Sequence, residues 1–209
     1  MTAVLPKLLI ATRNLGKAQE LAELLQGVPF LLTTLVQEGI KLEVEETGRT
    51  FQENALQKAR AYAQASGLLT LADDSGLEVE ALGWEPGVRS ARYAGPGASD
   101  GQRVEYLLSR LHGVPSEKRY ARFRCVIALA NAGGWTATCE GVCEGQVALE
   151  ARGDNGFGYD PVFSFPQKGR TLAELSTDEK NLVSHRGQAA RKARALLVDL
   201  ARRRRPTPL

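Results

Sequence analysis

A capped helix followed at once by an apolar run, in the segment 50–76, constrains the fold more than any other feature of this sequence. Thr50 and Glu53 have the spacing of a capping box, in which two side chains satisfy free amide groups at a helix start. The apolar residues that follow at helical spacing predict an amphipathic helix, and Gly67 is a natural residue for its end. The run 68–72 then predicts a buried strand that terminates in two aspartates. Alternation of helix and buried strand is typical of an α/β fold.

The amino-terminal segment shows the same alternation of strand and helix. The run 7–12 predicts a buried strand, the leucines in 16–26 predict a helix with Asn14 as its N-cap, and 30–35 predicts a second strand. The rest of the chain is expected to contain loops at 38–48, 83–97 and 152–161, helical segments at 99–112, 171–175, 177–184 and 188–203, and β-rich segments at 119–130 and 135–150. We predict a single α/β domain over residues 1–209, with the hairpin turn at 131–134 as a candidate for a second lobe.

The composition is that of an ordinary globular protein, with 43% hydrophobic and 24% charged residues in a chain of 209. A formal net charge of +3 excludes a strongly polycationic fold, although four arginines gather at Arg202–Arg205. No apolar run in the sequence approaches the roughly 20 residues that span a bilayer, and no signal peptide is recognisable, so we predict a cytoplasmic protein without a membrane partner. Three cysteines are too few for a disulfide framework and are interpreted as small buried hydrophobic residues.

The turn after the first predicted strand has the composition of an anion site. It reads Thr12-Arg13-Asn14-Leu15-Gly16-Lys17 and opens a helix, whose first amide groups are unpaired and lie at the positive end of the helix dipole. Lys17 adds a point charge suited to a phosphate. A P-loop would need glycine at Ala11 and a hydroxyl at Ala18, so a metal would have to be held by other residues. The alternative is a capped helix with an exposed lysine.

Two pairs of acidic residues could hold that metal. Asp73-Asp74 follows the predicted strand, and ligands of open α/β sheets bind at strand ends. Because successive side chains of a strand point to opposite faces, we expect one aspartate to face a ligand and the other to turn toward the structure. Glu45-Glu46 could supply a second carboxylate, and Mg²⁺ prefers one or two carboxylates plus waters and phosphates. The alternative for the aspartates is a turn with side-chain caps.

The capped helix itself carries two polar groups that a triphosphate could use. Asn54 and Lys58 are i and i+4 neighbours, so they could offer an amide and an ammonium group on one face. A solvated helix face is the alternative for this pair.

The loop 153–161 and the segment after it have groups suited to a nucleotide base. The loop combines three glycines, which allow close backbone approach, with two aromatic rings on which a base could stack. Its backbone amides could read the edge of the base. Lys180, His185 and Arg186 then bring three hydrogen-bond donors into one short segment, where the last two could bind keto oxygens. A capped or solvated helix end is the alternative for His185.

Together these segments resemble the inosine triphosphate pyrophosphatase family, also called XTP/dITP diphosphatases. The similarity covers nearly the whole chain in the family's order. The matching stretches are ATRNLGKAQEL (11–21), EETGRTFQENALQKA (45–59), ADDSGLEVEALGWEPGVRSARYAG (72–95), GDNGFGYDPVF (153–163) and ELSTDEKNLVSHRGQA (174–189). The resemblance implies an α/β fold in which an elongated mixed β-sheet is flanked by helices and divided into two lobes by a central active-site cleft. It also implies a homodimer.

The resemblance implies a role for each matching residue. Asp74 corresponds to the candidate general base and, with Glu45, to the Mg²⁺ carboxylates. The residues that correspond to substrate contacts are Thr12, Arg13, Asn14, Leu15, Gly16 and Lys17 in the triphosphate turn, Lys58, Ser75, the base-binding loop Phe157, Gly158, Tyr159 and Asp160, and finally Lys180, His185 and Arg186.

The implied reaction is hydrolysis of ITP, dITP or XTP to a monophosphate and pyrophosphate, which would remove noncanonical purine nucleotides from the pool. We expect Asp74 to act mainly by positioning water, because an ordinary aspartate with a pKa near ~3.9 is a weak base. A site built from donors favours 6-keto purines over adenine, whose amino group would leave those donors unpaired. How guanine is rejected does not follow from the sequence.

Three other functions are compatible with parts of the sequence. A pyrophosphatase of related fold could act on modified pyrimidines or in cell-division control. A nucleic-acid binder could use Arg202–Arg205 with the basic residues Arg191, Lys192 and Arg194, although basic residues near a helix end also oppose the helix dipole. A sensor could bind nucleotides without hydrolysis. We favour a small-molecule substrate and expect no stable nucleic-acid partner.

Overall fold

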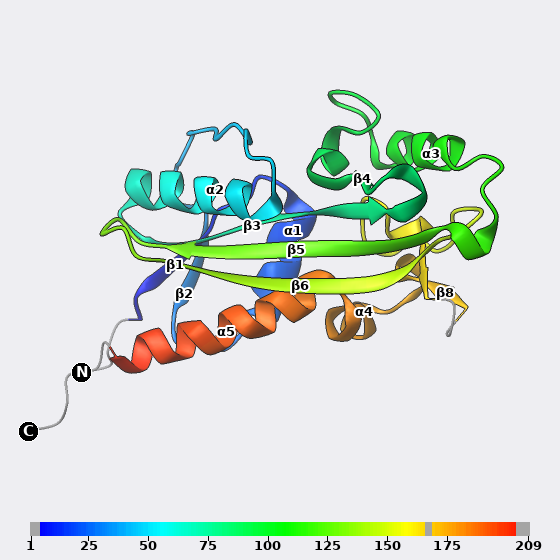
Figure 1. Ribbon diagram of the computed structural model, residues 1–209. Coiled ribbons are helices and arrows are strands. Elements are labelled where there is room, and N and C mark those ends of the chain that lie inside the picture. Colours follow the sequence, from blue (N-terminus) through cyan, green and yellow to red (C-terminus); the bar gives the residue numbers. More distant parts are fainter. Residues whose placement is uncertain (1–4, 166–168, 204–209) are drawn as a thin grey trace, which may run out of the picture. The chain divides into compact units, whose positions relative to one another are not determined.

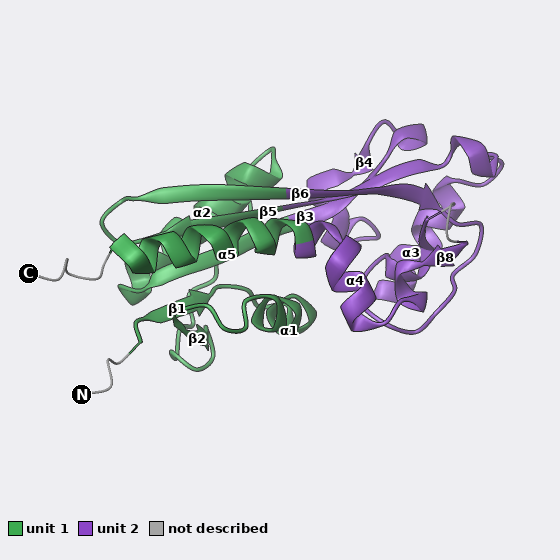
Figure 2. Cartoon of the chain, turned by 90° about the horizontal axis from the view of Figure 1, so that it is seen from below, with its two compact units in different colours: residues 1–74, 126–140, 188–209 green, residues 75–125, 141–187 purple. Residues whose placement is uncertain are grey.

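The computed structural model of the protein describes residues 5–165 and 169–203 (Figure 1). The chain forms two compact units (Figure 2), the first from residues 1–74, 126–140 and 188–209 and the second from residues 75–125 and 141–187. The strands are β1 (Lys7–Ile10), β2 (Leu31–Thr34), β3 (Leu69–Val79), β4 (Glu85–Pro86), β5 (Tyr120–Ala130), β6 (Thr136–Val147), β7 (Phe163–Phe165) and β8 (Arg170–Thr171). The helices are α1 (Leu15–Leu24), α2 (Phe51–Ser66), α3 (Asp100–Arg110), α4 (Thr177–Val183) and α5 (His185–Arg203), with 3-10 turns at Glu80–Leu82, Gly87–Arg92, Ser116–Lys118, Asp160–Val162 and Leu172–Glu174.

The strands form a mixed sheet, which confirms the predicted α/β class. Its hydrogen-bonded order is β2-β1-β3-β5-β6-β7-β8, and β4 pairs with β3. β1 lies parallel to both β2 and β3, whereas β4, β7 and β8 make antiparallel pairs. Strands β3, β5 and β6 each contribute residues to both units.

In the first unit, helices cover both faces of the parallel strands. α2 lies on one face, and α1 and α5 lie on the other (Figure 1). Leu8, Leu9 and Ile10 of β1 are buried, as expected for a strand with helices on both sides. α2 begins at the predicted capping box of Thr50 and Glu53 and ends at a left-handed glycine, so both of its predicted boundaries are confirmed.

β3 is longer than the sequence predicts. Instead of ending at Asp73, it runs through the polar residues 73–76 to Val79. The apolar pattern resumes there, and Leu77 and Val79 are completely buried. Sheet pairing and burial therefore override the turn signal of the Asp-Asp-Ser-Gly sequence, and the two aspartates lie in the middle of a strand.

The second unit has its own apolar core. Leu77 and Val79 pack with Val104 and Leu107 of α3 and with Phe123 and Phe163 from the strands. α3 lies within the helical segment predicted at 99–112 and begins at a capping box of Ser99 and Gln102. This core supports the loop 153–161, because Tyr159 and Val162 are also members of the cluster.

Three other predictions about local structure are corrected. The predicted loop 83–97 contains β4 and a 3-10 turn, which Ser90 stabilises by bonding to the backbone of Leu77 and Gly87. The last helix begins at His185 rather than at residue 188, because Ser184 accepts the Gly187 amide at 3.1 Å. The turn at 131–134 belongs to the first unit and does not form a second lobe by itself.

The three cysteines are buried free thiols, which confirms their interpretation as small core residues. None of the helices in the described part of the chain is long and apolar enough to cross a membrane.

Candidate functional site

The predicted anion turn is held by its own side chains and by the loop 38–48. Asn14 is the N-cap of α1, as predicted, and accepts the Lys17 amide at 2.9 Å. Thr12 accepts the Asn14 amide at 3.2 Å. The guanidinium group of Arg13 donates to the carbonyl groups of Lys41 and Leu42, so this side chain anchors the neighbouring loop. Leu15 is 84% exposed at the start of α1, and Gly16 follows it.

Asp73 and Asp74 point to opposite faces of β3, as predicted for successive strand residues. Asp73 Oδ2 lies 3.2 Å from Lys17 Nζ, on the side of α1. Asp74 meets α2 instead, where its Oδ1 lies 3.9 Å from Lys58 Nζ. Both carboxylates are buried, so each aspartate has a lysine that compensates its charge.

Asn54 has a different role from the predicted one. Its side chain is completely buried and donates a hydrogen bond to Asp74 Oδ2 at 2.9 Å. Its carbonyl oxygen accepts the Gly48 amide at 2.7 Å. The amide that the sequence could assign to a triphosphate therefore orients the Asp74 carboxylate. The capping-box register in α2 places residue 54 on the buried face, and that register was the only sequence signal for this role.

Burial and the neighbouring charges both shift the pKa of Asp74. Burial raises the pKa of the Asp74 carboxyl above the ordinary 3.8, and the positive charges of Lys58 and Lys17 counteract this only in part. Burial alone would lower the pKa of Lys58, but the negative charges of Asp74, Asp73 and Glu46 outweigh it and raise that pKa. Lys58 therefore stays protonated beside a carboxyl group whose proton affinity is increased.

Of the adjacent Glu45 and Glu46 in the loop 38–48, only Glu46 pairs with this cluster. Glu46 forms an ion pair with Lys58, whereas the side chain of Glu45 is exposed and its backbone carbonyl accepts a bond from Gln57 at 2.8 Å. Among the described residues, no three His, Cys, Asp or Glu side chains converge into a complete metal site. Magnesium needs only one or two protein carboxylates when waters and substrate phosphates complete its shell, and the buried Asp74, with Glu46 paired to the neighbouring Lys58, fits that requirement.

A second cluster of predicted residues lies in the second unit. Asp160 Oδ2 accepts the Phe157 amide at 2.9 Å and lies 2.5 Å from Lys180 Nζ, with both side chains buried. The Phe157 ring has Lys180 Nζ at 4.9 Å and the Arg186 guanidinium carbon at 5.4 Å from its centroid. Gly156 allows this packing, since a Cβ at its φ of +81° would lie 2.2 Å from Asp160 Oδ2.

Arg186 and His185 are fixed by different neighbours. Arg186 donates to Ser75 Oγ at 2.9 Å and thus joins the start of α5 to β3. The buried imidazole of His185 stacks on Phe123, with ring centroids 4.5 Å apart and planes 9° apart. The sequence did not single out Phe123, because an aromatic residue in a strand is usually a core residue.

Three backbone amides of the loop 157–160 donate hydrogen bonds within the protein. Besides the Phe157 amide, the Gly158 amide donates to Asp100 Oδ2 at 2.7 Å and the Asp160 amide to the Phe157 carbonyl at 3.3 Å. The Tyr159 hydroxyl donates to the Ser90 carbonyl at 2.9 Å. These three amides are therefore paired within the protein, while reading of a base edge by loop amides stays a prediction, and the loop presents an aromatic ring with two cations beside it.

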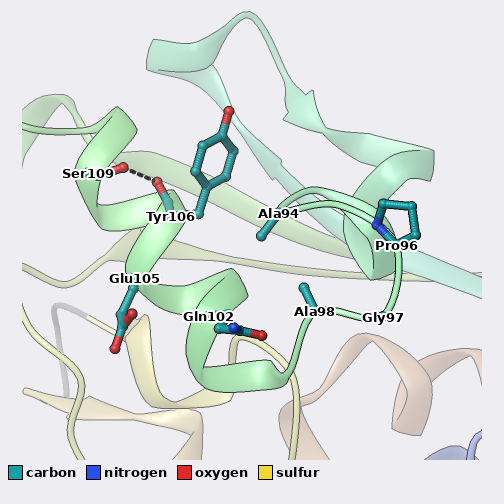
Figure 3. Close-up of a pocket in the computed structure, with 8 residues that line it drawn as sticks. All are labelled: Ala94, Pro96, Gly97, Ala98, Gln102, Glu105, Tyr106 and Ser109. Atoms are coloured by element: carbon teal, nitrogen blue, oxygen red, sulfur yellow. Dashed lines mark hydrogen bonds between the residues drawn. The ribbon is translucent and has the colours of Figure 1, made fainter.

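A separate open hollow of about 620 Å³ lies beside α3 (Figure 3). Its lining includes Ala94, Pro96 and Tyr106. Among the described residues that line the hollow, only Glu105 is charged, and its charge is negative. This hollow is poorly suited to a phosphate ligand, in contrast to the lysine–carboxylate cluster of the first unit.

The α/β fold carries two clusters of charged and aromatic side chains, one in each compact unit. One cluster supplies lysines and a buried carboxylate, and the other supplies a cation-flanked ring. The chain belongs to the Ham1 family, whose model matches residues 8–196.

Relatives with similar sequences carry one enzymatic name. A dITP/XTP pyrophosphatase of Bacillus subtilis is 47% identical over 93% of this chain and 98% of its own length. A dITP/XTP pyrophosphatase of Geobacter sulfurreducens is 51% identical over 92% of this chain and 95% of its own length.

Solved structures agree with the fold. A HAM1 protein from Coxiella burnetii has a TM-score of 0.84 and 44% identity, over 93% of this chain and 99% of that one. A nucleoside-triphosphatase, or dITP/XTP pyrophosphatase, from Mycobacterium abscessus has a TM-score of 0.73 and 43% identity, over 91% and 98% of the two chains.

Proposed function

We propose that this chain hydrolyses noncanonical purine nucleoside triphosphates, namely ITP, dITP and XTP, to the nucleoside monophosphate and pyrophosphate. The names of relatives that match almost the full chain support the reaction. The observation that carries the proposal is the buried Asp74 carboxylate, which is oriented by Asn54 and lies beside the ammonium group of Lys58. This combination suits hydrolysis of a phosphoanhydride, because it places a proton acceptor beside positive charge.

The lysines of the first unit have the charge that a triphosphate requires. Lys17 stands in the first turn of α1, where the positive end of the helix dipole also favours an anion. Lys58 keeps its proton because three carboxylates surround it. We expect both ammonium groups to exchange part of their pairing with Asp73, Asp74 and Glu46 for phosphate oxygens when substrate binds.

Asp74 is the proposed proton acceptor and positioning group for water. The water oxygen forms a bond to the α-phosphorus, the bond from that phosphorus to the bridging α–β oxygen breaks, and pyrophosphate leaves. Asp74 takes the proton released by the water. Burial raises its pKa, so the carboxylate without a bound metal is a stronger base than an ordinary aspartate.

Asp74 and Glu45 are the proposed carboxylate ligands for Mg²⁺, and Glu46 is adjacent to them. When bound, the ion would supply positive charge that stabilises the negative oxygens of the triphosphate. The hydrogen bond from Asn54 keeps the Asp74 carboxylate in one orientation.

The second cluster supplies the proposed base recognition. The Phe157 ring offers a stacking surface, and two cations lie beside it. His185 and Arg186 are proposed to donate to the 6-keto oxygen that inosine and xanthosine present, whereas adenine presents an amino donor there. Asp74 of the first cluster is followed in β3 by Ser75, which accepts the hydrogen bond from Arg186.

Three further expectations accompany this function. We propose a cytoplasmic homodimer that has no stable nucleic-acid partner. The basic residues of α5 support the last point, because Lys192 and Arg194 donate to the carbonyl groups of Glu140 and Gln26. The predicted cluster Arg202–Arg205 is described only as far as Arg203, and Arg204 and Arg205 lie outside the described residues.

Product analysis with a panel of purified triphosphates and Mg²⁺ tests the proposal. We expect ITP, dITP and XTP to give monophosphate and pyrophosphate in equal amounts, with kcat/KM above that for ATP and GTP. Asp74→Asn is the matched inactive variant. Release of orthophosphate, similar kcat/KM for GTP and ITP, or binding without turnover would each contradict the proposed function.

A further inference from the structure

The loop that carries Phe157 depends on a residue outside the predicted site. The Asp160 carboxylate closes a turn by accepting the Phe157 amide, and Lys180 pairs with that carboxylate. The next amide, that of Gly158, has a different acceptor: Asp100 Oδ2 at 2.7 Å. Asp100 is 58 residues away in sequence and is the first residue of α3.

The Asp100 carboxylate is held in a fixed orientation. The capping box of Ser99 and Gln102 sets the start of α3, and Asp100 Oδ1 pairs with Arg103. Arg103 also donates to the Ala91 carbonyl at 3.1 Å, so its guanidinium group is anchored to the preceding loop. One carboxylate oxygen is thereby occupied, and the other remains for the Gly158 amide.

The bond from Gly158 fixes an unusual backbone conformation. Gly158 has a φ of +65°, in the left-handed region that glycine adopts readily. Free glycine samples many conformations, so a partner for its amide is needed to keep one of them. A hydrogen bond between an amide and a carboxylate is stronger than one between neutral groups. The conformation at residue 158 in turn determines where the adjacent Phe157 ring lies.

We propose that Asp100 is a positioning residue for purine recognition: by holding the Gly158 amide it keeps the Phe157 ring beside Lys180 and Arg186. This inference rests on the proposed function for its link to purines. Asp100 acts through the loop, because both of its carboxylate oxygens bond to protein groups. Loss of Asp100 therefore affects binding of the base and spares the chemistry at the α-phosphorus.

Kinetics of Asp100→Ala and Asp100→Asn test this role. We expect the KM for ITP to rise roughly tenfold in Asp100→Ala and less in Asp100→Asn, which keeps a neutral acceptor. We expect kcat to stay within about twofold and inhibition by inorganic tripolyphosphate, which has no base, to be unchanged. Glu105→Ala, an exposed carboxylate of the same helix, is the control and should change none of these values.

Two further measurements separate positioning from a general loss of structure. Amide hydrogen exchange at Gly158, measured without nucleotide, should accelerate in Asp100→Ala while exchange in α2 stays unchanged. In a Phe157→Ala background, Asp100→Ala should add little to the KM, because the ring that it positions is gone.

Unchanged exchange at Gly158, additive effects of the two substitutions, or equal losses for ITP and tripolyphosphate would overturn the role of Asp100. Failure of the wild-type protein to hydrolyse any triphosphate would instead contradict the proposed function, and the exchange result would still stand.

Discussion

The side-chain amide of Asn54 donates to Asp74 Oδ2 at 2.9 Å, while its carbonyl oxygen accepts the Gly48 amide at 2.7 Å. One buried side chain thus connects Asp74, the proposed proton acceptor, to the loop that carries Glu45 and Glu46. Asn54→Ala should lower the free energy of unfolding by about 1–3 kcal/mol, because it leaves buried polar groups without their partner. It should lower kcat for ITP by at least roughly tenfold, because Asp74 loses its fixed orientation. Denaturant unfolding and steady-state kinetics measure the two effects.

The exposed Gln52 of the same helix supplies a control for this prediction, and Gln52→Ala should change neither quantity appreciably. A wild-type kcat in Asn54→Ala would mean that the orientation of Asp74 does not limit turnover.

Asp74→Asn should separate activity from stability. We expect kcat to fall by roughly 10²–10⁴, because the proton acceptor is lost. The pKa of Asp74 is raised in the folded state, so its contribution to stability is present below pH 3.8 and is lost as the pH rises through the raised pKa. At neutral pH the wild-type protein has a buried, ionised carboxylate at this position, which costs stability. The neutral amide removes that cost, and Glu46 remains to neutralise Lys58. The Tm at neutral pH should therefore stay constant or rise, and a large fall would show that the Asp74 charge supports the fold.

The acid side of the pH profile should report the charges around Asp74. Only the deprotonated carboxylate can accept a proton, so kcat/KM should fall at a pH above the ordinary 3.8 of aspartate. Lys58 lowers the pKa of Asp74, and Lys17 lowers it less. Lys58→Gln should therefore move the acid limb to higher pH, and Lys17→Gln should move it in the same direction by less. An acid limb that moves to lower pH in either variant would contradict this arrangement of charges.

Phe123→Leu should weaken base discrimination. The stack on Phe123 fixes the plane of the His185 imidazole, and leucine provides no flat surface to replace it. We expect the ratio of kcat/KM for ITP to that for ATP to fall several-fold, together with a loss of about 1–2 kcal/mol of stability from the core. Phe163→Leu is the matched control, since Phe163 packs on Phe123 in the same cluster at 4.8 Å. It should lower the Tm similarly and preserve discrimination; equal losses of discrimination in both variants would count against the role of the stack.

Trp84 has a strained backbone conformation that its side-chain contacts offset. Its φ of +71° is unfavourable for a residue with a Cβ, by roughly 1–2 kcal/mol. Arg122 lies over its indole at 4.3 Å from the ring centroid, and Tyr120 makes an edge contact at 6.1 Å. Trp84→Ala loses these contacts and keeps the strain, whereas Trp84→Gly loses the contacts and relieves it. Chemical denaturation should find Trp84→Gly the more stable of the two by about 1 kcal/mol, and the reverse order would show that the backbone is unstrained.

Sequence alone determined the elements whose signals are local. The capping box of Thr50 and Glu53, the N-cap Asn14 and the left-handed Gly67 are all found where they were predicted. Each depends on contacts within a few residues, so tertiary structure has little opportunity to change it. The opposite orientation of Asp73 and Asp74 was also predictable, since it follows from the alternation of a strand.

Tertiary structure alone decided where β3 ends and which partners the polar side chains have. The strand continues past the aspartates because Leu77 and Val79 enter a core built from residues distant in sequence. Asn54 binds Asp74, His185 stacks on Phe123, and Asp100 holds the Gly158 amide across separations of 20, 62 and 58 residues. Such pairs leave no periodic signal, because their geometry exists only after the elements between them have folded.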